Sequence, residues 1–203
     1  MFFYKQKLNM SSRFWFLVLM IVISSLKISV CDGSEEAKFF RSEANYVVPD
    51  VPVVRHDGGK STFLKEIDDG RPVLVNFVFI SCSAICPMLS HIFSKVQTKL
   101  TKDGKPFHLI TISIDPENDT PASLAEYAKK FSAGSNWSFY TGSREASLNL
   151  QKAFKAYRGD KMNHASLILM RAKPGEKWVR LEGFVSPEDV VKEFYSLSNS
   201  SVH

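Results

Sequence analysis

The sequence predicts an α/β fold with a largely parallel central sheet, preceded by an N-terminal export segment. A continuous apolar and β-branched run at residues 73–79 is typical of a strand buried on both faces. Segments of helical period alternate with further strand-like runs along the chain. Near the start, one apolar run at residues 14–23 follows a short basic stretch, which is the pattern of an export signal.

Residues 1–31 are expected to be a signal peptide or a membrane anchor. A bilayer span needs about 20 apolar residues, and the stretch 14–30 is marginal with Lys27 inside it. Cleavage and retention therefore both stay open. Cys31 stands where a bacterial lipoprotein carries its lipidated cysteine, although the preceding Val30 is bulky for such a junction.

The charge balance argues against a nucleic acid as a partner. The chain has a net charge of +5, but four of its 26 basic residues and none of its 21 acidic residues precede Cys31. The remaining residues have a net charge of only +1. The basic character therefore belongs to the targeting segment and not to a surface for an anionic polymer.

One folded domain is expected, because 203 residues with 44% apolar content form one core once the targeting segment is set aside. We place a polar tether at residues 32–45, the domain at 46–198 and a C-terminal tail at 199–203. The tether assignment rests on the charged sequence DGSEEAKFFRSEAN, which has no sustained period.

In the first part of the domain, the sequence VVPDVPVVRHDGGKSTFL predicts short strands around a turn at residues 57–59. The buried strand 73–79 then leads through a short loop into an amphipathic helix. The apolar face of this helix is formed by Leu89, Ile92, Phe93, Val96 and Leu100.

In the middle of the domain, the sequence predicts two more pairs of a strand and a helix. Residues 108–115 alternate as a strand, and Thr120 with Pro121 indicates an N-cap and a first helical position. A short strand at 137–141 follows, and Ser143 is expected to cap the next helix. The residues of that helix expected to face the core are Ala146, Leu150, Ala153, Phe154 and Tyr157.

The chain closes with a hairpin of strands 165–170 and 178–185, joined by RAKPGEK. Ser186 and Pro187 then open a final helix. The order is strand, helix, strand, helix, short strand, helix, hairpin, helix. This order is the plan of a thioredoxin-like fold with an inserted segment.

Cys82 and Cys86 lie in the junction between the buried strand and the following helix. A spacing of four places two helical side chains about one turn apart, close enough to share a metal ion or form a disulfide. The helix N-terminus stabilises thiolates, so both thiols are expected to be more acidic than a free cysteine. Taken alone, the pair is also compatible with buried structural cysteines.

His164 is the expected third ligand. It precedes the strand 165–170, and in thioredoxin-like folds the loop at this point lies against the cysteine-bearing helix. Two thiolates and one imidazole suit Cu(I) in a trigonal site and tolerate Cu(II), whereas zinc usually takes a fourth ligand. We therefore expect one copper ion per domain, although a histidine beside a strand is also compatible with a structural role.

Other polar residues are weaker candidates. Asp115 and Asp119 follow the second predicted strand and either shape the electrostatics of the site or cap the next turn and helix. The remaining histidines lie on another helix face, in a turn, at a strand start and at the C-terminus; they are His91, His56, His108 and His203.

Four motifs extend over most of the predicted domain. They are VLVNFVFISCSAICP, ISIDPENDTP at 112–121, WSFYTG at 137–142 and NHAS at 163–166. Together they resemble the Sco/SenC (PrrC) family of copper chaperones for cytochrome c oxidase assembly, with the similarity running from about residue 53 to 194.

This resemblance implies a thioredoxin-like fold, membrane attachment, and copper held by Cys82, Cys86 and His164. It also implies delivery of copper to the CuA centre of cytochrome c oxidase subunit II, or reduction of that centre's cysteines. Two positions depart from the family: Ser83 replaces a usual proline, and Asn163 replaces a usual aspartate. Neither is a ligand, but a missing charge at 163 is expected to affect copper affinity or reduction potential.

Three functions stay open at this point. The first is a metallochaperone that serves oxidase subunit II or another copper protein. The alternative is an enzyme, a thiol:disulfide reductase that cycles a Cys82–Cys86 disulfide with a thiol reductant. The third is a binding module with a permanent disulfide. The expected location is the cell envelope, as a periplasmic domain anchored in the inner membrane or exported with a cleaved signal, or the mitochondrial inner membrane in a eukaryote.

Overall fold

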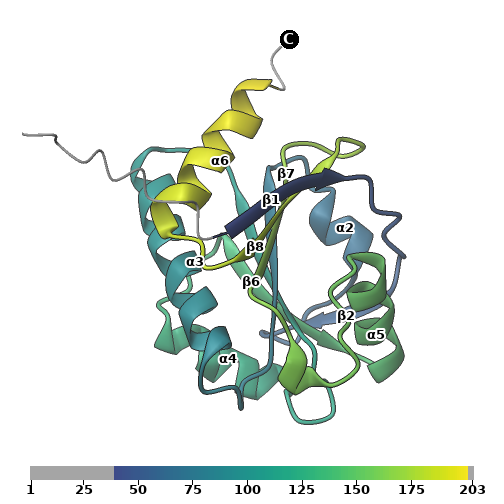
Figure 1. The fold of residues 1–203 in the computed structure, drawn as a ribbon. Helices are drawn as coiled ribbons and strands as arrows, with labels where there is room; N and C mark the ends of the chain where they lie inside the picture. Colours follow the sequence, from purple (N-terminus) through teal and green to yellow (C-terminus); the bar gives the residue numbers. More distant parts are fainter. Residues whose placement is uncertain (1–38, 201–203) are drawn as a thin grey trace, which may run out of the picture. The chain divides into compact units, whose positions relative to one another are not determined.

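A mixed eight-stranded sheet organises residues 39–200, the part of the chain that the structure, a computed structural model, describes (Figure 1). The strand order is β1-β8-β7-β4-β5-β6-β2-β3. The strands are β1 (Phe39–Ala44), β2 (Pro52–Arg55), β3 (Lys60–Thr62), β4 (Val73–Val78), β5 (His108–Ser113), β6 (Trp137–Gly142), β7 (Leu167–Arg171) and β8 (Trp178–Gly183). The helices are α2 (Phe63–Ile67), α3 (Ile85–Lys102), α4 (Pro121–Lys130), α5 (Arg144–Ala153), the 3-10 turn η1 (Lys161–Asn163) and α6 (Pro187–Ser200).

The central strands β4, β5 and β6 are parallel, as the continuous apolar run in β4 predicts. Every residue of β4 and β5 is buried, because helices cover both faces of the sheet. The outer strands are antiparallel: β7 to β4, β8 to β7, β1 to β8, and β2 to both β6 and β3. The sheet is therefore parallel only at its centre.

This pairing brings distant parts of the sequence to one edge of the sheet. Asn76 near the end of β4 lies opposite Ile168 near the start of β7, and Phe39 at the start of β1 lies opposite Gly183. The ends of β4, β5 and β8 and the starts of β7 and β1 therefore share one edge, which we call the site end. The starts of β4, β5 and β6 form the far end.

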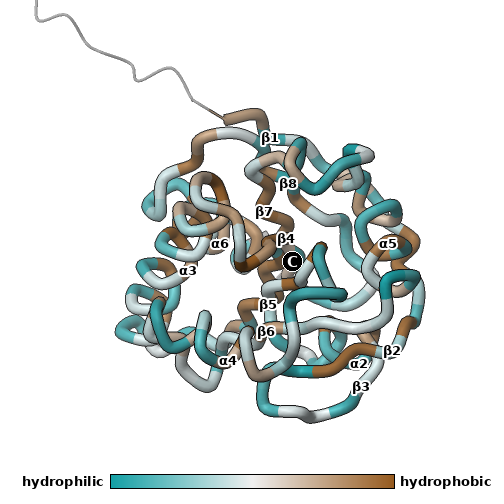
Figure 2. The backbone as a smooth tube through the Cα atoms, turned by 90° about the horizontal axis from the view of Figure 1, so that it is seen from below, coloured by the Kyte–Doolittle hydropathy of each residue, from teal (hydrophilic) through white to brown (hydrophobic). Residues whose placement is uncertain are grey.

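Two helical layers cover the sheet, with α3, α4 and α6 on one face and α2 and α5 on the other (Figures 1 and 2). On the first face, Leu89, Ile92 and Phe93 of α3 pack with Leu124 of α4 and Phe194 of α6. On the second face, Phe63 and Ile67 of α2 pack with Leu150 and Phe154 near α5. The thioredoxin-like α/β fold that the sequence predicts is therefore the observed one.

Two helix starts follow the predicted capping residues. The Thr120 hydroxyl accepts a hydrogen bond from the Ser123 backbone N–H at 3.2 Å at the start of α4. The Ser143 hydroxyl accepts one from the Ala146 N–H at 3.0 Å at the start of α5. Each bond satisfies a backbone donor that has no partner within the helix.

The expected tether at residues 32–45 is wrong for its second half, because Phe39–Ala44 form strand β1. This strand pairs with the open edge of β8 along its whole length, and Phe39 packs against the core. Charged residues are common on edge strands, where one face meets water, so the polar composition concealed the strand. At the other terminus α6 continues to Ser200, into the expected tail.

A second correction concerns Tyr157, which was expected to face the core and is 43% exposed. Helix α5 ends at Ala153, and Lys155 adopts a left-handed backbone with φ of 52° that redirects the chain. Helical spacing therefore stops applying before Tyr157. The short elements α2 and η1 were not predicted, since five and three residues carry too little periodicity.

The signal or anchor expected at residues 1–31 lies outside the described residues. Within the described part of the chain, no helix has the length and apolar character needed to cross a membrane.

Candidate metal centre

Cys82, Cys86 and His164 meet at the site end of the sheet. The His164 Nε2 atom lies 3.1 Å from the Cys86 sulfur and 3.9 Å from the Cys82 sulfur. All three ligand atoms lie within 4.8 Å of one another, and together they can hold a metal ion. The residues predicted as ligands are thus brought together from the β4–α3 junction and from the loop after η1, which are far apart in the sequence.

Cys82 lies in the turn between β4 and α3 and is partly exposed. Its backbone N–H donates to the Phe79 carbonyl at 3.1 Å, which closes the turn. Burial raises the pKa of the Cys82 thiol, but backbone N–H groups of Ala84, Ile85 and Cys86 outweigh it and hold the pKa below its ordinary value. The lowered pKa of Cys82 is therefore the effect that the helix N-terminus predicts.

Cys86 lies in the first turn of α3 and is fully buried. Burial raises the pKa of its thiol, and the Phe79 N–H, which donates to the sulfur at 3.4 Å, offsets only part of this effect. The nearby Cys82 side chain raises the pKa further. The expectation that both thiols are more acidic than a free cysteine is therefore wrong for Cys86, because desolvation exceeds the helix-terminus contribution.

His164 is held by its other ring nitrogen. Its Nδ1 lies 2.8 Å from the Lys161 carbonyl oxygen, so Nδ1 carries the proton and donates it. Its ring also meets the Phe79 ring edge to face, with centroids 5.1 Å apart. These two contacts direct Nε2 towards the sulfurs, which is the arrangement that a metal-binding histidine needs.

The loops around the site are joined by acidic residues. Asp115 accepts a hydrogen bond and an ion pair from the Lys161 ammonium at 2.6 Å, and also binds the Asn118 amide. Asp119 accepts from the Ser113 hydroxyl at 2.6 Å and from the Ile80 N–H. Both acids thus hold the loops that carry the ligands.

Sequence reasoning did not identify Lys161 or Phe79 as neighbours of the site. Lys161 both donates to Asp115 and offers its carbonyl to His164, and its ammonium lies 5.4 Å from the centre of the Phe79 ring. The only sequence signal was the position of Lys161, three residues before the candidate ligand.

The donor set fits a soft, low-coordinate metal ion. Metal–ligand distances of about 2–2.3 Å in a planar three-coordinate site would separate the ligands by roughly 3.5–4 Å. The distance of 3.9 Å from Cys82 Sγ to His164 Nε2 lies in this range, and the shorter distance to Cys86 requires a small outward shift. Two sulfurs and one imidazole nitrogen favour copper over magnesium or calcium, which prefer oxygen ligands.

A cavity of about 150 Å³ opens beside His164. Its lining includes Ile114 after β5, Gln151 on α5, and Tyr157, Arg158 and Lys161 on the loop that leads to the site. His164 is therefore adjacent to a small polar hollow on the α5 side of the sheet.

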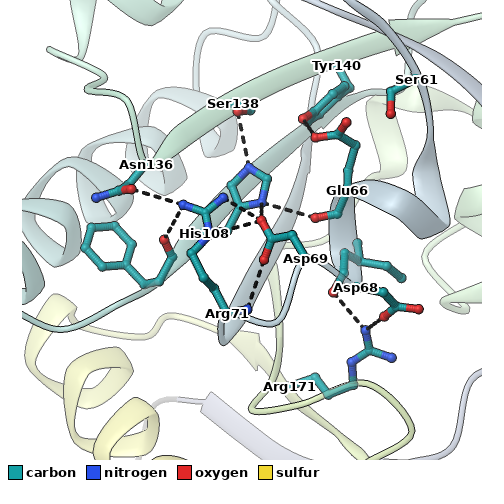
Figure 3. Close-up of polar contacts among 12 residues, drawn as sticks. Ser61, Glu66, Asp68, Asp69, Arg71, His108, Asn136, Ser138, Tyr140 and Arg171 are labelled. Atoms are coloured by element: carbon teal, nitrogen blue, oxygen red, sulfur yellow. Dashed lines mark hydrogen bonds and ion pairs between the residues drawn. The ribbon is translucent and has the colours of Figure 1, made fainter.

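The other described histidines lie apart from this cluster. His91 is exposed on α3, and His56 accepts a hydrogen bond from the Phe139 N–H in the turn after β2. His108 is buried at the far end of the sheet, where Figure 3 shows it among oxygen-bearing side chains. His203 lies outside the described residues.

The two positions that depart from the family pattern are both exposed. Ser83 lies in the turn before α3, and Asn163 ends η1 beside His164. The Asn163 backbone N–H donates to the Asp160 carbonyl, which closes the turn that carries His164. Asn163 therefore shapes this turn through its backbone, while its side chain faces solvent.

Comparison with known proteins identifies relatives of the chain. An SCO1 protein homolog from Bacillus subtilis is 30% identical over 134 residues, which cover 64% of this chain and 66% of that relative. A SCO2-like protein from Rickettsia conorii is 37% identical over 62 residues, 30% of each chain. The matched region thus spans just under two thirds of the first relative and less than one third of the second.

Solved structures share the fold. BsSco, described as a member of the Sco family of cytochrome c oxidase assembly proteins with a disulfide switch, has a TM-score of 0.65 at 26% identity. That likeness covers 79% of this chain and 98% of BsSco. Arabidopsis thaliana ScoI, solved with copper bound, has a TM-score of 0.66 at 21% identity over 76% of this chain and 99% of its own.

A family model named SCO1/SenC matches residues 42–197, which include every strand from β2 to β8 and all three candidate ligands. The match thus covers most of the chain and agrees with the fold, the relatives and the sequence motifs. The chain belongs to the SCO1/SenC family.

Proposed function

We propose that this protein is a copper-binding assembly factor for cytochrome c oxidase that holds one copper ion through Cys82, Cys86 and His164. The observation that carries the proposal is the approach of two sulfurs and one imidazole nitrogen to within 4.8 Å of one another. Membership of the SCO1/SenC family and the copper-bound structures of relatives support the same metal. Copper is the cargo of the protein in this proposal.

Delivery of copper would proceed by stepwise exchange of ligands. A three-coordinate ion has room for an incoming thiolate, and Cys82 is the more accessible of the two sulfurs. An acceptor cysteine would therefore approach from the side of Cys82, while buried Cys86 and the hydrogen-bonded His164 retain the ion until the new bond has formed.

The recipient in this proposal is the CuA centre of cytochrome c oxidase subunit II, or another copper protein of the same compartment. We further propose that residues 1–31 export the chain or anchor it in the membrane, so that the folded domain works in the cell envelope or its mitochondrial counterpart. The apolar run at 14–23 supports this location.

Anaerobic titration with Cu(I) against a chromophoric chelator tests the proposal. The parent is expected to bind one ion, and His164→Ala is expected to bind it at least about 100-fold more weakly, more than the loss of a ligand's hydrogen-bond partner costs. His91→Ala is the matched control, because His91 is exposed on α3 away from the sulfurs. Equal affinity in all three proteins would contradict copper ligation by His164.

A second function, thiol:disulfide reduction, is favoured by the unequal burial of the two cysteines. The Cys82 thiolate would attack a target disulfide, form a mixed disulfide and release one target thiolate. The Cys86 thiolate would then attack the Cys82 sulfur, forming the Cys82–Cys86 disulfide and releasing the second target thiolate. Two electrons and two protons pass to the target, and a dithiol reductant restores the pair.

The two functions are distinguished by their need for the imidazole. Reduction of a disulfide substrate that survives His164→Ala but is lost in Cys82→Ser would favour the reductase. Both cysteines are free in the structure, so a permanent disulfide has no support there. Counting thiols before and after mild reduction tests this third reading, since a structural disulfide resists glutathione.

A further inference from the structure

Five large apolar side chains are markedly exposed in the described part of the chain. They are Phe40 at 69%, Val47 at 93%, Tyr157 at 43%, Met162 at 70% and Phe184 at 69%. Single exposed apolar residues are ordinary, but several around one site indicate an interaction surface.

Two of these residues lie on the loop that carries His164. Met162 belongs to η1, two residues before the candidate ligand. Tyr157 lines the same cavity as His164, on the segment that follows α5. Both side chains therefore flank the imidazole side of the metal centre.

Two more reach the site end through strand pairing. The Gly183 N–H donates to the Ser166 carbonyl at 3.0 Å, which places the end of β8, and Phe184 after it, next to the segment following His164. Phe40 lies on β1 opposite Glu182 of β8. We call Phe40, Tyr157, Met162 and Phe184 the apolar rim.

Val47 is the exception, and it lies at the other end of β1. The strand ends at Ala44, which pairs with Trp178 at the start of β8, and Val47 follows three residues later. Among the described residues, the large exposed apolar side chains are therefore concentrated at the site end of the sheet.

Basic side chains accompany the rim. Residues 152–161 contain four of them against one acid, Asp160; the four are Lys152, Lys155, Arg158 and Lys161. Arg158 pairs with Glu182 and Lys161 with Asp115, while Lys152 and Lys155 are exposed. The Lys152 ammonium lies 5.8 Å from the centre of the Tyr157 ring. The surface beside the rim thus carries uncompensated positive charge.

We propose that the apolar rim and the adjacent basic stretch 152–161 form the docking surface for the protein that accepts copper. The complementary face of that acceptor would present apolar side chains around its own copper-binding cysteines, with carboxylates facing Lys152 and Lys155. An apolar centre with charged surroundings is the usual anatomy of a specific interface, and opposite charges accelerate the encounter. This inference rests on the proposed function, since it names the acceptor's side of the same site.

The test measures association of the full chain with the metal-free CuA domain of a cytochrome c oxidase subunit II by calorimetry. A Met162→Ser/Phe184→Ser double variant is expected to bind at least about tenfold more weakly, because apolar contacts that become buried supply much of the binding energy of an interface. Val47→Ser is the matched control, because Val47 is an exposed apolar residue that follows the opposite end of β1, and it is expected to bind like the parent.

Reversal of charge in the basic stretch is a second test of the docking surface. Lys152→Glu/Lys155→Glu is expected to weaken binding further at low salt than at high salt, because screening removes the effect of exposed charges. Lys60→Glu/Lys65→Glu, exposed on the β3–α2 segment, is the control for net charge and is expected to leave binding unchanged.

Two outcomes would overturn the inference: the parent fails to bind the CuA domain, or the double variant binds it as tightly as Val47→Ser does. Copper titration of the same proteins reports on the proposed function separately, because no rim residue is a ligand and all variants are expected to take up one ion. Unfolding midpoints of the variants serve as a folding check, since the changed side chains are exposed.

Discussion

His164 and His108 lie at opposite ends of the same sheet, and their surroundings differ in kind. His108 opens β5 at the far end and is 3% exposed. Its Nδ1 lies 3.1 Å from both the Asp69 carboxylate and the Glu66 carbonyl, and its Nε2 lies 3.2 Å from the Ser138 hydroxyl (Figure 3). Both ring nitrogens are thus engaged by oxygen atoms.

His164 has only one nitrogen engaged by oxygen, while the other faces two sulfurs. The far end is also cross-linked by Arg71, which binds Asp69, the Phe107 carbonyl and Asn136. His164 is therefore a candidate ligand through the nitrogen that the fold leaves available. A histidine with both nitrogens satisfied becomes part of the framework.

The largest expected effect is loss of copper from the site end. Cys86→Ser replaces a soft buried ligand with a hydroxyl, so Cu(I) affinity should fall by more than the roughly 10–100-fold that a ligand's hydrogen-bond partner contributes. Copper content after dialysis and Cu(I) titration measure this. Retention of one tightly bound ion would contradict copper ligation by Cys86.

A substitution of His108 at the far end should lower the stability of the fold and leave copper binding unchanged. His108→Ala leaves buried Ser138 and half-buried Asp69 without their ring partner, so the free energy of unfolding should fall by about 1–3 kcal/mol. Denaturant unfolding measures this, and Cu(I) titration of the folded variant should still give one ion. A stability equal to that of the parent would show that the network is not structural.

The far end should also make stability depend on pH. Burial and the nearby Arg71 lower the pKa of His108 in the folded state, while Asp69 and Glu66 offset only part of this. The unfolded chain therefore binds the proton more readily than the folded protein does. The contribution of neutral His108 to the free energy of unfolding is fully present above about pH 6.5, and it is lost as the pH falls towards the folded-state pKa.

Each unit by which the folded-state pKa lies below the unfolded value is worth about 1.4 kcal/mol. Unfolding midpoints between about pH 5 and 8 measure the effect in the parent and in His108→Gln, which keeps a polar side chain but cannot titrate in this range. The same slope in both proteins would exclude His108 as its source.

A smaller effect is expected from the contact that positions His164. Asp115→Asn removes the charge that pairs with Lys161, whose carbonyl holds the imidazole, so Cu(I) affinity should fall by up to about tenfold. Glu193→Gln, which weakens the pair between Arg41 and α6, is the control and should leave copper affinity unchanged. A loss shared by both variants would indicate general loosening of the fold.

The smallest effect is expected at Asn163. Restoring the family's usual residue with Asn163→Asp adds a carboxylate that faces solvent beside His164, where water screens it. Cu(I) affinity should change by less than about threefold, as measured by chelator competition at two salt concentrations. A larger change would mean that the side chain turns inwards when copper is bound.

Much of this architecture could be predicted because it depends on local patterns. The run 73–79 predicts a buried strand, the spacing of Leu89, Ile92 and Phe93 predicts a helix face, and Thr120 and Ser143 predict helix starts. Strand β1 could not be predicted this way, since its pairing with β8 depends on an edge that exists only after the hairpin folds. The exposure of Tyr157 could not be predicted for a similar reason, because the left-handed backbone at Lys155 ends the helical spacing.

Local sequence patterns are enough to predict the fold class, the pair Cys82 and Cys86, and the candidate His164. Periodicity, cysteine spacing and chain order are properties of neighbouring residues, so they can be read directly. The tertiary structure alone decided that Cys82 is the accessible, more acidic sulfur and Cys86 the buried one, and that Lys161 orients the imidazole. Burial and long-range hydrogen bonds set these properties, and both depend on which distant segments the sheet brings to one end.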